Sequence, residues 1–147
     1  MRLVGLLMLA LFLAMPATGI GKERPSVSKK RWPLTGSYVL KRTKGAGGVL
    51  LVKQVSPNRI EFELNCNRGA PSYNMGIARA TVDIKNGVAV YRTTEFTGPC
   101  ELKLAFKGTR VVVSQTGSDS DCGFGHGVYC DGVYRLKSRK APKFEAR

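Results

Sequence analysis

The chain has 147 residues and a formal net charge of +14, because 24 lysines and arginines stand against 10 aspartates and glutamates. This length predicts one domain rather than two, and a chain of this size buries roughly two-thirds of its unfolded surface. The excess of positive charge favours polyanionic partners in general, including nucleic acid, lipopolysaccharide and acidic proteins, but it specifies none of them.

The N-terminus has the composition of a secretory signal peptide. A single positive charge precedes an apolar run over residues 3–15, and small residues follow at Ala17 and Gly19. This pattern predicts a cleaved signal peptide over residues 1–21 and a mature chain that is periplasmic or secreted. A membrane-spanning helix is the alternative, but it needs roughly 20 apolar residues, so no membrane span is expected after cleavage.

Basic segments flank the predicted domain on both sides. Residues 22–33 are rich in lysine and arginine, contain proline and show no periodicity, which predicts a flexible arm. Residues 138–147 form a basic tail of similar composition. Both segments are expected to attract polyanions, but Trp32 and Phe144 do not make the series of stacking aromatics that a single-stranded nucleic acid needs.

Between these segments, residues 34–137 alternate between apolar and polar side chains as β-strands do. The clearest case is residues 59–66, where Ile60, Phe62 and Leu64 alternate with polar residues. Asn86-Gly87 predicts a type I′ hairpin turn, because both central positions of that turn need a positive φ. Eight strands are expected, over residues 36–42, 49–55, 59–66, 76–85, 88–93, 100–107, 109–115 and 128–136.

Eight sequential antiparallel strands without a helix predict an all-β fold, an eight-stranded up-and-down barrel. Closure of such a barrel leaves no free edge strand, which an open sheet would have. A two-sheet β-sandwich is the alternative. The side chains expected to point inward are bulky enough to fill the lumen, and they are Tyr38, Leu40, Phe62, Leu64, Leu104, Phe106, Tyr134 and Leu136.

The four cysteines are expected to meet at one end of this barrel. The connections after the first, third, fifth and seventh strands share one end, and the cysteines lie in or beside these connections. An exported chain favours two disulfides over free thiols, and four cysteines allow three pairings. We favour Cys100–Cys122, which links neighbouring loops, with Cys66–Cys130 across the barrel end. A zinc site is the alternative, but zinc usually takes two close pairs of ligands, which this spacing does not give, so no metal is expected.

The loop over residues 116–127 holds residues that could suggest catalysis or calcium binding. His126 is the only histidine, and its serine and aspartate neighbours in one loop would have to supply every other catalytic group, so no enzyme is expected. Asp119 and Asp121 alternate as in a calcium loop, but the glycine and the distal glutamate of such a loop are missing. Hydrogen bonding within the turn is the favoured interpretation, and no cofactor is expected.

Residues 122–129, with Asp131-Gly132 and Tyr134, resemble the closing motif of small exported bacterial barrels related to periplasmic lysozyme inhibitors. Residues 68–72 and the segment at Cys100 belong to the same resemblance. It implies a barrel that blocks the substrate cleft of a peptidoglycan-cleaving hydrolase with a loop. The inhibitors present a Ser-Gly-x-x-Tyr loop, whose nearest counterpart here, residues 71–74, lacks the glycine. Since animal lysozymes are basic like this chain, an acidic hydrolase is the better electrostatic match.

The sequence therefore predicts an exported, non-enzymatic protein that binds a cell-wall hydrolase through the loops at residues 67–75 and 116–127. Two alternatives stay open, namely a barrel that encloses one small ligand and the capture of polyanions by the basic arms. The candidate contact residues are Arg68, Ser72, Tyr73, Phe124 and His126.

Overall fold

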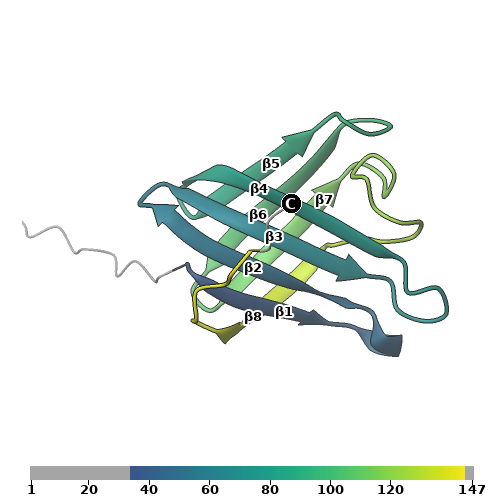
Figure 1. Cartoon of the computed structure of the whole chain (residues 1–147), viewed down its shortest axis with the longest axis horizontal. Helices are drawn as coiled ribbons and strands as arrows, with labels where there is room; N and C mark the ends of the chain where they lie inside the picture. Colours follow the sequence, from purple (N-terminus) through teal and green to yellow (C-terminus); the bar gives the residue numbers. More distant parts are fainter. Residues whose placement is uncertain (1–33, 145–147) are drawn as a thin grey trace, which may run out of the picture. The chain divides into compact units, whose positions relative to one another are not determined.

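A computed structural model describes residues 34–144 of the chain, and these fold into a closed β-barrel (Figure 1). The predicted signal peptide and the basic arm at residues 22–33 lie outside the described residues. The strands are β1 (Gly36–Lys41), β2 (Gly47–Ser56), β3 (Arg59–Asn67), β4 (Met75–Lys85), β5 (Val88–Thr93), β6 (Cys100–Lys107), β7 (Arg110–Thr116) and β8 (Gly132–Ser138).

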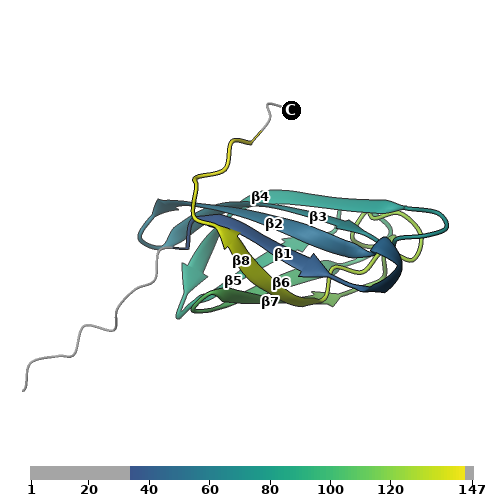
Figure 2. The same ribbon diagram turned by 90° about the horizontal axis from the view of Figure 1, so that it is seen from below.

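Each strand pairs antiparallel with the next one in the sequence, and β8 pairs with β1 to close the barrel. Figure 2 shows the sheet wrapped around on itself, with β8 beside β1. The predicted eight-stranded up-and-down barrel is therefore confirmed, and the alternative two-sheet sandwich is not formed. In the described part of the chain no helix is long and apolar enough to cross a membrane.

The apolar side chains of the alternating pattern point into the barrel and form its core. Ile60, Phe62 and Leu64 on β3 are fully buried, whereas the residues between them are partly exposed on the outer face. Of the eight side chains expected in the lumen, five are buried and three, Leu40, Phe106 and Leu136, are partly buried and pack against the others. Large aromatic and aliphatic side chains therefore fill the interior, as the sequence predicts.

The connections differ sharply between the two ends of the barrel (Figure 1). One end, which we call the turn end, carries the two-residue turns at residues 57–58, 86–87 and 108–109. Asn86 and Gly87 have φ of 52° and 77°, which agrees with the predicted hairpin turn. The other end, which we call the loop end, carries the longer connections at residues 42–46, 68–74, 94–99 and 117–131.

Two strands begin at positions that differ from the prediction by two or more residues. The last strand begins at Gly132 rather than at residue 128, because Val128 and Cys130 are buried in the loop that closes the barrel end. The second strand begins at Gly47, two residues before the predicted start. Glycine is needed there: a Cβ on Gly48 would lie 2.6 Å from the hydroxyl oxygen of Tyr134.

Candidate binding site at the loop end

Both disulfides fasten the loop at residues 117–131 to the barrel. Cys66–Cys130 joins this loop to β3, and Cys100–Cys122 joins it to the start of β6, with Cα–Cα distances of 5.6 and 5.0 Å. All four cysteines are buried at the loop end, so the predicted placement and pairing are confirmed. Two disulfides in so small a domain are typical of proteins that fold in an oxidising compartment outside the cytoplasm.

Two aspartates organise the same loop from within. Asp119 accepts hydrogen bonds from the backbone N–H groups of Gly127 and Ser120, and these bonds lower the pKa of its carboxyl. Asp121 accepts from the hydroxyl and the N–H of Ser118 at 2.7 and 2.8 Å and from the hydroxyl of Thr97, which lowers its pKa in the same way. Both carboxylates are thus acceptors within turns, as the sequence interpretation favoured over calcium binding.

The backbone carbonyl of His126 joins this loop to its neighbour at residues 68–74. It accepts a hydrogen bond from Arg68 Nη1 at 3.3 Å and another from Asn74 Nδ2 at 2.8 Å. The N–H of Gly125 adds a bond of 2.9 Å to the carbonyl of Met75. The structure therefore brings Arg68 and His126 together, and the exposed side chain of Arg68 helps to fix the loop.

Phe124, expected as an exposed contact residue, is buried instead, with 7% of its surface exposed. Its ring lies over Gly76 at the start of β4, where a Cβ would come within 2.5 Å of the ring. Only glycine at that position leaves room for the phenyl group. Phe124 is therefore an apolar anchor that holds the loop at residues 117–131 against the barrel.

Tyr73 and His126 are the most prominent exposed side chains among the candidates. Tyr73 is 59% exposed, and the His126 side chain is 90% exposed. Tyr73 has a φ of 50°, in the left-handed region that costs a residue with a side chain roughly 1 kcal/mol or more. Its ring lies near Gly45 of the neighbouring connection. Ser72 precedes it and is also exposed.

The sequence prediction missed three exposed apolar residues at this end, Met75, Phe96 and Tyr129. Phe96 covers Gly123, where a Cβ would lie 2.3 Å from the ring, and half of its surface is exposed. For Phe96 the available signal was an aromatic residue in a loop between two predicted strands, whereas Tyr129 was assigned to the last predicted strand. Phe96 and Tyr129 widen the exposed apolar surface of the loop end beyond the two loops that were expected.

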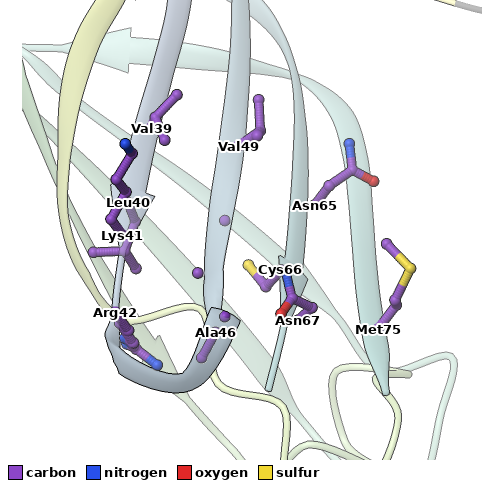
Figure 3. Close-up of a pocket in the computed structure, with 13 residues that line it drawn as sticks. Val39, Leu40, Lys41, Arg42, Ala46, Val49, Asn65, Cys66, Asn67 and Met75 are labelled. Atoms are coloured by element: carbon purple, nitrogen blue, oxygen red, sulfur yellow. The ribbon is translucent and has the colours of Figure 1, made fainter. Parts of the chain in front are cut away.

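A groove of about 430 Å³ runs along the outer wall next to the loop end (Figure 3). Val39, Val49 and Asn65 lie along it on three neighbouring strands. The hollow arises at Gly47, which has no side chain between its cross-strand neighbours Lys41 and Asn67. Because the groove is outside the wall and the lumen is filled, it does not support the alternative of a small ligand inside the barrel.

The loop end does not share the positive charge of the whole chain. Its four connections contain three cations, Arg42, Lys44 and Arg68, against four carboxylates, so their net charge is −1 with His126 neutral. The chain as a whole carries +14. The positive charge is therefore concentrated on the walls, the turn end and the flanking segments.

Comparisons with protein family models, curated proteins and solved structures found no match to this chain. Its function has to be inferred from its residues and their geometry.

Proposed function

We propose that this protein is an exported, non-enzymatic inhibitor that binds a peptidoglycan-cleaving hydrolase with its loop end and blocks the substrate cleft. The observation that carries the proposal is the exposure of Tyr73 and His126 on two loops that are fixed to each other and to the barrel. The proposed location is the periplasm or the extracellular space, where the two disulfides would persist.

Rigidity supports a binding role for these loops. Ordering a mobile loop costs free energy on association, so a loop that is already fixed loses less when it binds. Here two disulfides and the shared carbonyl of His126 fix the loops before any partner arrives. Exposed tyrosine rings on such a surface are typical of residues that dominate binding energy.

The position of His126 supports binding rather than catalysis. Its Nδ1 lies 3.7 Å from Oδ2 of Asp119, and the same oxygen accepts the hydrogen bond from the N–H of Gly127. Asp119 is therefore engaged in holding the loop, and this geometry is too long for the carboxylate–histidine hydrogen bond of a catalytic triad.

The charge of the loop end widens the range of hydrolases it could bind. The total charge of the chain favours an acidic partner through long-range attraction. At contact distance, however, the partner meets connections with a net charge of −1, and screening weakens the influence of charges more than about 8 Å away at physiological salt. A basic lysozyme and an acidic hydrolase are both suitable targets for the test.

The test measures the clearing of a peptidoglycan suspension by a basic animal lysozyme and by an acidic bacterial muramidase. We expect the oxidised protein to inhibit one of them at near-stoichiometric concentration. Tyr73→Ala should weaken inhibition by about 30-fold, the effect of losing a residue that dominates binding. Val55→Ala is the matched control, because Val55 is an exposed apolar residue near the turn end. Full activity of both hydrolases at high concentrations of the oxidised protein would refute the proposal.

A further inference from the structure

Three cations form a row across neighbouring strands near the turn end. Lys107 of β6 lies directly opposite Arg110 of β7, and Arg110 lies directly opposite Arg135 of β8. All three side chains are exposed on the outer wall. Within residues 34–144, none of them lies in an ion pair with a carboxylate. We call these three residues the cation row.

Like charges in directly opposite positions of a sheet destabilise it, because their Cβ atoms are only about 5 Å apart. The same barrel avoids this arrangement on its other strands. Arg59 faces its cross-strand partner Asp83 at 3.2 Å, and Arg92 faces Glu101 at 2.7 Å. The cation row is thus a departure from the way this wall places its arginines. A ligand with several negative groups would neutralise these three cations and remove their mutual repulsion. The cation row is therefore a candidate binding site for such a ligand.

An apolar row runs beside the cation row on the same wall. It consists of cross-strand neighbours of β5 to β8, and its last member, Val133, is 41% exposed. Two further exposed lysines lie nearby: Lys85 on β4 is the cross-strand partner of Val88, and Lys137 follows Arg135 on β8. The apolar row is Val88, Ala105, Val112 and Val133.

We propose that this wall binds the surface of a bilayer that contains anionic phospholipids, with the cation row on the phosphates. Cations spread over several strands beside exposed valine match a two-dimensional surface of phosphate groups and acyl chains. Nucleic acid is the less suitable partner, because the outward positions of β5 to β8 carry no aromatic ring on which a base could stack. A barrel bound in this way keeps its loop end away from the lipid contact and open to a protein partner.

The experiment measures sedimentation of the full, oxidised mature chain with vesicles of equal parts phosphatidylglycerol and phosphatidylcholine in about 0.1 M salt. One variant combines Lys107→Gln, Arg110→Gln and Arg135→Gln. Each cation near such a surface contributes about fivefold, so we expect the three changes to weaken binding about 100-fold. The matched control combines Lys53→Gln, Arg59→Gln and Arg92→Gln, which removes the same charge from cations that lie across from carboxylates.

The control should lose less than about tenfold, because Arg59 and Arg92 are paired with carboxylates and Lys53 lies on β2, outside the wall of the cation row. Equal losses in the two variants would overturn the proposal, since net charge and the flanking basic segments would then account for binding. Arg110→Lys with Arg135→Lys should keep vesicle binding within about threefold, because attraction to a lipid surface depends on charge rather than on the shape of the guanidinium. A loss of binding in this variant would overturn it as well.

A second measurement separates lipid from soluble phosphate polymers. Direct titration with a duplex DNA and with a polyphosphate should show the triple glutamine variant and its control to be weakened alike, because non-specific attraction follows total charge. A selective loss of DNA or polyphosphate binding in the cation-row variant, with vesicle binding unchanged, would assign the row to a polymer and overturn the membrane proposal.

Discussion

The two ends of this barrel are built from different kinds of interaction. The turn end is made of two-residue turns whose geometry depends on local residues such as Gly87 and Gly108 with positive φ. The loop end depends on contacts between residues far apart in sequence, including two disulfides with sequence separations of 64 and 22. Its connections are close to neutral, whereas the cation row lies near the turn end.

The two ends therefore differ in role: the turn end holds the strands in place, and the loop end presents a surface. Hairpin turns limit the turn end to short, strongly determined connections, which leave little room for a variable binding surface. Loops fastened by disulfides keep long connections in one arrangement without secondary structure. The loop end can therefore carry exposed side chains at defined positions, which is what a protein-binding surface requires.

Removal of the disulfide Cys66–Cys130 should have the largest effect, a global loss of stability with additional loosening at the loop end. Cys66→Ala with Cys130→Ala opens a closed loop of 64 residues, for which chain entropy gives a loss of about 4 kcal/mol in the free energy of unfolding. Urea unfolding measures this loss, and hydrogen exchange locates it. We expect exchange at residues 117–131 to rise by more than this global loss explains, whereas the amides beside the turn at 86–87 should lose no more protection than the global loss. Uniform loss of protection at both ends would contradict the separation of the two regions.

Phe124→Ala should produce the next largest loss. Truncation of a buried phenylalanine typically costs about 3 kcal/mol or more, and here it also leaves a space above Gly76. Because Phe124 is buried, it should weaken hydrolase binding only by loosening the loop. Phe124→Leu, which fills part of the space, should restore most of the stability and most of the binding. Full binding by a destabilised Phe124→Ala protein would show that the loop does not have to be fixed.

Tyr73→Asn should raise stability while it removes binding. Asparagine tolerates a φ of 50° better than tyrosine, so the free energy of unfolding should rise by up to about 1 kcal/mol. The same change removes the exposed ring, so inhibition of the hydrolase should fall. Urea unfolding and the peptidoglycan assay on one preparation give both quantities. A protein that loses stability with this change would show that the ring makes contacts that outweigh the backbone cost.

The sequence predicts those parts of this fold that depend on local patterns. Alternation in residues such as Ile60, Phe62 and Leu64 identifies the strands, and the number of strands between the cysteines places all four at one end. The direction of Phe124 could not be predicted in this way. Loop residues follow no alternation, and the space that Phe124 occupies is created by Gly76, which is distant in sequence.

The complete cation row could not be predicted from the sequence, for a related reason. Lys107 and Arg110 flank a two-residue turn, so their pairing follows from the sequence alone. The position of Arg135 opposite Arg110 depends on where β8 begins, and buried Val128 and Cys130 shift that start to Gly132. Register across a long loop is set by how the loop packs, which no periodic pattern reports.

Acid should weaken the loop end before it affects the turn end, and this is the smallest effect we expect. Hydrogen bonds lower the pKa of Asp119 and Asp121 in the folded protein below the value near 4 of an unfolded chain. Above that value both states are ionised and the stabilisation is complete. As the pH falls below about 4, the unfolded chain binds protons that the folded chain does not, so stability decreases.

The urea midpoint measured from pH 6 to pH 3 should therefore fall more steeply in the wild type than in Asp119→Asn with Asp121→Asn. Glu63→Gln is the control, because Glu63 lies on β3 away from these loops, and it should follow the wild type. Identical slopes in all three proteins would mean that the two aspartates do not stabilise the loop.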